Sequence, residues 1–505
     1  MPYPSKFFAQ TNPGRMAALG RLLDFEPVDP RGCRVLEFGC GDGSNLISHA
    51  YALPDSEFVG IDISGEHIKK ATRWAGEIGL SNVEFQQCDV LEMHEDDFGK
   101  FDYLVAHGLI TWVPREVTQR VFELFGALLT ESGIGYVSYD CYPGGHLREM
   151  VREMMMFHTR NIESPLEKVE AAVSFLDLIG NNTSDQSAYK QVLLAENIRH
   201  SKHVPSDFYH DNLSDCYYPS RFSEIAERLE RNGLEYLCES DYQSMSPRNL
   251  SPSLQEFLKD ITCIRELEDY MDFARGRQFR KTLFCRKGSP INRQLTPDRL
   301  SKISIASTAT PDKPHDVEKE STPVRFASQL GAGIEIDHPV TKMVLTETGK
   351  RVGAPVNIDD LLQDVKKDVK VADWDHEEEI CRRILLRLIE DTAMLELYSY
   401  ADEGTGNLPQ KPNASPLAKW QIRVGTSVTS RFGSVIGLED SVAKHLVGLA
   451  DGSRTVAEIE TGIEKFVVAE GIEDEVRSDL DVWVRESIVN LTRIGIINDD
   501  KSPGH

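Results

Sequence analysis

Length, composition and charge set the first limits. The chain has 505 residues, too many for one hydrophobic core and enough for about three domains of roughly 100–200 residues. Its 40% hydrophobic and 27% charged residues exclude wholesale disorder. With 81 acidic and 56 basic residues the formal net charge is −25, which disfavours general nucleic-acid binding.

The N-terminus and the cysteines bear on the compartment. Residues 1–20 lack the continuous apolar segment of a secretion signal. The longest apolar run, residues 103–114, is much shorter than the roughly 20 residues that span a bilayer. The nine cysteines are scattered, with no CxxC pair or close-set His/Cys group, so we expect reduced thiols and no metal site. These features predict a cytoplasmic protein without membrane insertion.

Short apolar runs alternate with longer amphipathic runs from Arg34 to about Asp140. Their hydrophobic period predicts the order βαβαββαβ. The apolar runs are nearly uninterrupted, which is typical of parallel strands buried on both faces of a sheet. The pattern indicates a doubly wound α/β fold.

The pattern changes after this region. Residues 146–233 repeat apolar residues at helical spacing, which predicts a helical insertion. Strand-like runs at 234–240 and 280–286 lie on either side of a helix around 254–274. They would complete a seven-stranded sheet as a hairpin-like final pair. We therefore expect a first domain over residues 1–288.

The remaining chain contains two similar segments. Residues 289–319 are rich in Ser, Thr and Pro and indicate a connection with one strand at 303–306. Two sets of three short helical segments and a strand then follow in the same order, in a middle regulatory domain (289–400) and a C-terminal domain (401–505). An exposed linker is expected at 401–415. The repeat suggests two small winged-helix-like modules, although such a series also recurs by chance.

A glycine-rich loop follows the first predicted strand, where residues 35–45 are VLEFGCGDGSN. Gly39 and Gly41 lack Cβ atoms, so a ligand could lie against the backbone at the carboxyl end of the sheet. A simple tight turn is one alternative. NAD binding is another, but its GxGxxG spacing requires glycine where Ser44 stands. The preceding acid, Glu37, suits a ligand ammonium better than a pyrophosphate.

Two further acids end the next strands. Asp62 lies about 20 residues after the glycines, where a carboxylate can accept both ribose hydroxyls. Asp89 follows the third strand, where it could accept from an adenine amino group. Either acid alone is more simply an exposed strand-end or capping residue. Together with Glu37 and the loop, they predict a nucleoside-binding cleft.

Residues 37–43 match ExGxGxG, and with Asp62 and Asp89 the sequence resembles the class I S-adenosylmethionine-dependent methyltransferases. A closer resemblance covers nearly the whole chain. It is similar to bacterial methyltransferases that carry a methyltransferase regulatory domain, a family that includes lysine methyltransferases acting on outer-membrane proteins. The segments that carry this resemblance are 4–13, 106–114, 138–148 and 270–280.

The resemblance implies a Rossmann-like sheet, S-adenosylmethionine as the cofactor and lysine amines of a protein as the acceptor. The expected cofactor-binding residues are Gln10, Thr11, Glu37, Gly39, Gly41, Asn45, Asp62, Ile63, Asp89, Val90 and His107. Three positions depart from the family, which tends to have His at Asn12, Asn at Asp140 and Trp at Gly145. The last two lie in the expected acceptor loop, so the resemblance bears more on the fold than on the acceptor.

Methyl transfer requires the donor and acceptor to lie in line at about 3–3.5 Å, and needs no metal. A lysine amine, with an ordinary pKa of about 10.4, must lose its proton before it attacks. Aromatic side chains after the strand ends could receive the ammonium and exclude water. The expected catalytic residues are Trp112, Tyr139, Tyr142 and His146. Turn packing for Trp112 and structural hydrogen bonding for His146 are the simpler alternatives.

Other functions stay open at this point. They are a small-molecule N- or O-methyltransferase, a non-catalytic S-adenosylmethionine-binding interaction protein, and a transcriptional regulator, which the acidic charge disfavours. A deep pocket beside Tyr139 and Tyr142 would favour a small molecule. A groove leading onto the middle domain would favour a protein, for which the resemblance suggests a cell-envelope protein. The helical insertion is expected to form a lid or the contact of a homodimer.

Overall fold

The computed structural model describes most of the chain. The described residues are 5–200, 205–314, 322–327, 333–402, 406–425, 427–438, 440–471 and 479–498. Among them, no helix combines the length and apolar character needed to cross a membrane. All nine cysteines are free thiols.

A seven-stranded sheet in the order β3-β2-β1-β4-β5-β7-β6 forms the centre of the first domain. Its strands are β1 (Arg34–Phe38), β2 (Glu57–Asp62), β3 (Val83–Gln87), β4 (Phe101–Ala106), β5 (Leu129–Asp140), β6 (Leu234–Glu239) and β7 (Phe279–Arg286). Only β7 runs antiparallel to its neighbours, so the carboxyl ends of the other six strands lie at one edge. The predicted seven-stranded doubly wound fold and its hairpin-like final pair are confirmed.

Both faces of the sheet are buried, as the apolar strands predict. Along β1, Val35 belongs to the core on one face and Leu36 to the core on the other. The first face packs against α1 (Pro13–Leu22), α2 (Ser44–Ala52) and α3 (Gly65–Ile78). The second packs against α4 (Arg115–Leu128) and α9 (Phe222–Arg231). Successive residues of a strand point to opposite faces, so each strand supplies both cores.

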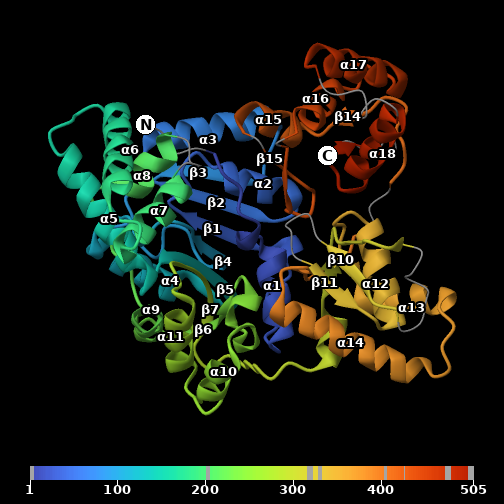
Figure 1. The fold of residues 1–505 in the computed structure, drawn as a ribbon, viewed down its shortest axis with the longest axis horizontal. Helices are drawn as coiled ribbons and strands as arrows, with labels where there is room; N and C mark the ends of the chain where they lie inside the picture. The colour runs from blue at the N-terminus through green and yellow to red at the C-terminus, as the bar shows by residue number, and fades with distance from the viewer. Residues whose placement is uncertain are drawn as a thin grey trace.

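The helical insertion has its own small core and lies on the far side of the sheet from the C-terminal half of the chain (Figure 1). Its helices are α5 (Gly144–Thr159), α6 (Pro165–Asn182), α7 (Ala188–His200) and α8 (Pro205–Leu213). The predicted helical insertion at 146–233 contains α6, α7, α8 and all but the first two residues of α5. The single helix expected near 254–274 is instead divided into α10 (Pro252–Leu258) and α11 (Ile264–Arg275).

The middle part of the chain packs on the first domain. Its helices are α12 (Pro339–Lys350), α13 (Ile358–Asp368) and α14 (Trp374–Asp391). A small sheet has the order β12-β8-β13, from β8 (Ser304–Ala306), β12 (Val356–Asn357) and β13 (Glu396–Tyr398), and a second joins β9 (Thr310–Pro311), β10 (Val324–Ala327) and β11 (Gly333–Ile336). Buried residues such as Ile305 and Leu385 belong to the same apolar core as Val35. The middle part is therefore continuous with the first domain.

The C-terminal part, drawn in orange and red in Figure 1, has a core of its own that also includes a few middle residues. Its elements are β14 (Asn413–Ala414), α15 (Pro416–Val424), β15 (Ser427–Thr429), β16 (Val435–Gly437), α16 (Ser441–Leu449), α17 (Val456–Ala469), α18 (Leu480–Arg493) and β17 (Ile497–Asn498). Three helices followed by a strand recur here as in the middle part, in agreement with the predicted repeat. The end of the expected linker is not loose, because β14 pairs with β17.

Candidate active site

The glycine loop joins β1 to α2 at the carboxyl edge of the sheet. Gly41 and Gly43 both have positive φ angles, +55° and +76°, in the left-handed region that favours glycine. A Cβ at Gly43 would lie 2.7 Å from the ring of Phe85, so this glycine allows the loop to pack on β3. A Cβ at Gly41 would meet no atom within 4 Å. The backbone at Gly41 is therefore open to a ligand, while Gly43 serves packing.

Glu37 lies buried near the end of β1. Its Oε1 accepts a hydrogen bond from Nδ2 of Asn45 at 2.9 Å. Its Oε2 is buried and has no hydrogen-bond partner among the described residues. Burial raises the pKa of Glu37 to about 8, and the nearby carboxylates of Asp62 and Asp42 add to the rise. A buried carboxylate oxygen without a partner is costly, and a ligand ammonium would satisfy it.

An N-terminal arm, residues 5–12, lies over this loop. Ser5 Oγ donates to Oδ2 of Asp42 at 2.7 Å, and the Phe8 amide donates to Oδ1 of Asn45 at 3.0 Å. The Phe8 ring stacks on His107, which follows β4, with ring centroids 3.7 Å apart. The arm thus covers the carboxyl ends of β1 and β4.

Thr11 of the arm is buried, and His107 is half-buried against the arm. Thr11 Oγ1 lies 2.9 Å from Nε2 of His49 and 3.0 Å from Nδ2 of Asn45, which donates to it. His107 Nδ1 is hydrogen-bonded to the Tyr136 hydroxyl at 2.8 Å. Burial, with smaller contributions from two lysines, lowers the pKa of His107 to about 3. His107 is therefore neutral near pH 7 and does not repel a cationic ligand.

Asp62, at the end of β2, holds the glycine loop. Its Oδ2 accepts from the Gly41 amide at 2.9 Å, and its Oδ1 accepts from the Ser64 amide at 2.8 Å. Burial raises the pKa of Asp62, but the His67 ring and these two amides together hold it below its usual range. The side chain is therefore a carboxylate at neutral pH and retains lone pairs for a ligand hydroxyl.

Exposed apolar side chains lie beside the strand-end acids. Ile63, just after β2, is 68% exposed, and Leu91, after β3, is also exposed. Val90 is half-buried beside Leu91. Asp89 Oδ1 accepts from the Leu91 amide at 2.9 Å, which is a capping contact. An apolar surface with a carboxylate at its edge suits a flat heterocycle that carries an amino group.

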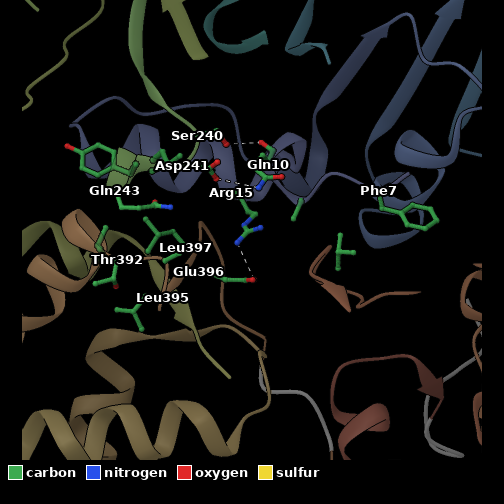
Figure 2. A pocket seen from close by; sticks show the side chains of 16 residues that line it. Phe7, Gln10, Arg15, Ser240, Asp241, Gln243, Thr392, Leu395, Glu396 and Leu397 are labelled. Carbon is green, nitrogen blue, oxygen red and sulfur yellow. Dashed lines mark hydrogen bonds and ion pairs between the residues drawn. The ribbon is translucent and has the colours of Figure 1, made fainter. Parts of the chain in front are cut away.

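Gln10 lies on the other side of the arm, away from the glycine loop. Its Nε2 donates to Asp241 Oδ1 at 3.4 Å, and its carbonyl accepts from Ser240 Oγ at 3.2 Å. Figure 2 shows Gln10 beside Arg15, which pairs with Glu396 of β13 at 3.2 Å. These residues line a cavity of about 280 Å³ between the arm, the end of β6 and the middle part of the chain. The structure thus places Gln10 in this cavity, apart from the other expected cofactor residues.

Trp112 lies in a cluster of aromatic rings and arginines. Its ring centroid is 5.0 Å from that of Tyr217, which follows the insertion. Arg148 and Arg152 of α5 lie 5.1 Å and 5.5 Å from the Trp112 ring centroid. Arg148 also pairs with Asp140 at 2.6 Å. Because two guanidinium groups already lie against the Trp112 ring, its expected role as a receiver of the acceptor ammonium is not supported by this placement.

Tyr139 and Tyr142 point to different places. Tyr139 is 1% exposed and belongs to the core between the sheet and α4. The sequence predicts a catalytic role for Tyr139, but the inward position on β5 buries the side chain, so the prediction for this residue is corrected. Tyr142 stacks on His146 with ring centroids 4.1 Å apart, and its hydroxyl donates to Glu149 Oε1 at 3.0 Å. Tyr142 and the exposed His146 therefore form a separate polar pair at the start of α5.

Tyr217 and the two arginines of α5 are not among the predicted site residues. The arginines also donate to the backbone carbonyls of Asp211 and Ser214, so they hold the end of α8 against α5. Tyr217 comes from a segment about 100 residues after Trp112, and only its aromatic character signalled a site. The residues of this cluster come from separate segments of the chain, and only the tertiary fold brings them together.

Comparisons with known proteins agree with this architecture. A model described as a methyltransferase domain matches residues 29–196, one described as a predicted methyltransferase regulatory domain matches 205–286, and one described as the PKMT C-terminal winged helix domain matches 410–476. The regulatory-domain model thus covers α8 to β7, whereas the sequence analysis placed a regulatory domain at 289–400.

Two curated relatives come from Rickettsia prowazekii (strain Madrid E). Uncharacterized protein RP789 is 32% identical over 315 residues, which are 62% of this chain and 57% of that protein. The match therefore spans little more than half the length of this relative. Uncharacterized protein RP028 is 29% identical over 47% of this chain and 95% of its own.

A solved structure matches nearly the whole chain. PKMT2 from Rickettsia typhi superposes over 98% of this chain and 100% of its own, with a TM-score of 0.87 and 25% sequence identity. The same protein has been solved in complex with AdoHcy, and that structure matches this chain equally well.

Proposed function

We propose that this chain, a member of the class I S-adenosylmethionine-dependent methyltransferases with a regulatory domain and a PKMT C-terminal winged helix domain, transfers methyl groups to lysine side chains of a protein. The observation that carries the proposal is the buried Oε2 of Glu37, which has no hydrogen-bond partner within the described part of the chain, near the open backbone of Gly41. An ammonium group and a close approach to the backbone are what the aminoacyl end of S-adenosylmethionine offers.

The other residues at this edge fit the same ligand. Asp62 would accept from the ribose hydroxyls, and Ile63 would pack on the adenine ring, with Asp89 and Val90 at its far edge. Gly39, Asn45, Thr11 and His107 would complete the enclosure. The PKMT2 complex with AdoHcy, which has the same fold, supports this assignment.

The bound cofactor would supply a methyl group on a sulfonium, which is already activated for transfer. The protein's part is to orient the reactants and to exclude water. The arm excludes water by packing Phe8 over His107. Because His107 is neutral, its ring does not repel the positive charge of the sulfonium. Tyr142 and His146 remain the proposed acceptor-side contacts, with Trp112 holding the arginine cluster in place.

A protein acceptor is favoured over a small molecule by the position of the cavity. Its walls are the arm, the end of β6, the end of α14 with β13, and Val435 of β16 (Figure 2). Residues of the middle part of the chain form one wall of the cavity, and neither Tyr139 nor Tyr142 lines it. We propose that the reaction takes place in the cytoplasm, which the nine free thiols support. We propose a cell-envelope protein as the acceptor. We also propose that the helical insertion forms the contact of a homodimer.

The test is a transfer assay with the full chain. The purified protein is incubated with S-adenosylmethionine labelled in its methyl group and with a fractionated bacterial lysate, and peptides that gain label are mapped by mass spectrometry. We expect label on lysine side chains, and much less label with Glu37→Gln at the same cofactor concentration. Label confined to small molecules would contradict the protein acceptor, and binding of the cofactor without any transfer would identify a non-catalytic binding protein.

A further inference from the structure

Helix α15 of the C-terminal part packs on α3 and reaches α2, the helix that begins at the glycine loop, through one buried hydrogen bond. Trp420 of α15 is buried, and its ring centroid is 5.0 Å from that of Trp74 in α3 and 6.0 Å from that of Phe7 in the arm. The side chain of Asn12, at the end of the arm, donates to the Phe432 carbonyl at 3.3 Å. The C-terminal part thus contacts both the arm and the cofactor-side helices.

Gln421 makes the polar part of this contact and is fully buried. Its Oε1 accepts from the Thr429 amide at 2.8 Å, and its Nε2 donates to Thr429 Oγ1 at 2.7 Å. The same Nε2 also donates to Ser48 Oγ of α2 at 3.2 Å. The two bonds to Thr429 fix the amide plane, so the second N–H can only point at Ser48.

Ser48 continues the chain of hydrogen bonds to the glycine loop. Its Oγ donates to the Ser44 carbonyl at 2.9 Å, which leaves its lone pairs for Gln421. Ser44, the first residue of α2, donates from its amide to Asp42 Oδ1 at 3.2 Å, and its hydroxyl contacts the same oxygen. The other carboxylate oxygen of Asp42, Oδ2, accepts a hydrogen bond from Ser5 Oγ of the arm at 2.7 Å. Ser44, Ser48 and Asp42 are all buried.

We propose that Gln421 is a positioning residue for the cofactor, through which docking of the C-terminal part sets the conformation of the glycine loop and the arm. The inference rests on the proposed function. Buried hydrogen bonds tolerate few alternative arrangements, because an unmade bond leaves a costly polar group. Loss of the Gln421 bond therefore loosens the first turn of α2 and, through Asp42, the closed arm. Cofactor affinity becomes a property of the whole chain and not of the first domain alone.

The experiment compares variants at both ends of the Ser48–Gln421 bond. Gln421→Met keeps the unbranched shape and removes the amide, and Ser48→Ala removes the hydroxyl. We expect each to weaken S-adenosylhomocysteine binding by about tenfold in calorimetry. The loss of affinity in the double variant should be smaller than the sum of the two single losses, because both variants remove the same Gln421–Ser48 hydrogen bond. KM for the protein acceptor should stay unchanged.

The matched control is Arg423→Ala on the same helix. Arg423 pairs with Glu77 of α3 at 3.4 Å on the surface, outside the buried chain, so its loss should change the affinity by less than about twofold. Unchanged affinity in both Gln421→Met and Ser48→Ala, or additive losses in the double variant, would overturn the inference. If Gln421→Met fails to fold, Ser48→Ala alone decides. If the wild-type chain binds no S-adenosylhomocysteine, the proposed function fails as well, whereas tight wild-type binding with unaffected variants removes only the role of Gln421.

Discussion

The proposed cofactor side and the proposed acceptor side of the carboxyl edge differ in whether their polar and aromatic groups already have partners. On the cofactor side, Glu37 retains a buried oxygen without a partner, and the backbone at Gly41 is open. On the acceptor side each expected ring already has a neighbour: Arg148 lies against Trp112, Tyr139 is within the core, and Tyr142 stacks on His146.

The difference indicates that the cofactor side already has its binding geometry before a ligand binds, whereas the acceptor side does not. The cofactor side needs only a ligand with an ammonium group to complete its hydrogen bonds. The acceptor side needs a substrate that either displaces existing contacts or binds beside them. We therefore expect substitutions on the cofactor side to act on affinity and those on the acceptor side to act on transfer or on stability.

The largest effect is expected from Glu37→Gln, which removes the charge that faces the ligand ammonium and keeps the side-chain shape. A hydrogen bond to a charged group contributes about 1.5–3 kcal/mol, so affinity for S-adenosylhomocysteine should fall by about 10–150-fold. Isothermal calorimetry measures it. Wild-type affinity in a folded Glu37→Gln variant would mean that the unpaired oxygen of Glu37 does not bind the ligand and does not distinguish the cofactor side from the acceptor side.

The pH dependence of binding also tests the contact between Glu37 and the ligand ammonium. Burial raises the pKa of Glu37 from 4.5 to about 8, so at pH 7 the free protein carries a proton there. Binding an ammonium requires the carboxylate and releases that proton. Affinity should rise by about tenfold per pH unit between about pH 6 and 7.5, level off as the pH passes the pKa of Glu37, and fall once the amino group of the ligand deprotonates. Calorimetry in two buffers of different ionisation enthalpy should report proton release, which Glu37→Gln abolishes.

A smaller effect, on transfer alone, is expected from Tyr142→Ala. This change removes the ring that stacks on His146 and the hydroxyl bound to Glu149, so the acceptor amine loses a wall. Transfer from labelled cofactor should fall by about tenfold with little change in cofactor affinity. Tyr142→Phe, which keeps the ring, is the control and should fall less. Equal rates for Tyr142→Ala and the wild type would remove this residue from the acceptor side.

The smallest effect on transfer is expected from Tyr139→Phe. The Tyr139 hydroxyl lies 3.3 Å from Thr282 Oγ1 inside the core, so its loss should lower the free energy of unfolding by about 0.5–1.5 kcal/mol. Denaturant unfolding measures this change. The transfer rate should stay within about twofold of the wild type, and a large loss of transfer without loss of stability would return Tyr139 to the acceptor site.

The order of elements in the first domain was readable from the sequence, because strands buried on both faces carry uninterrupted apolar runs. The glycine loop and Glu37 were readable too, since one short segment contains the strand end, the turn and the acid. The Trp112 cluster could not be predicted in this way, because Tyr217 reaches it only through the folded insertion. Likewise, Gln421 and Ser48 lie 373 residues apart, and no local pattern links them.

The most direct test is a crystal structure of the full chain with S-adenosylhomocysteine at saturation. We predict the amino group within about 2.7–3.2 Å of Glu37 Oε2 and the ribose hydroxyls at Asp62. An empty glycine loop at saturating ligand, or a ligand bound elsewhere with Glu37 Oε2 still unpaired, would contradict the account.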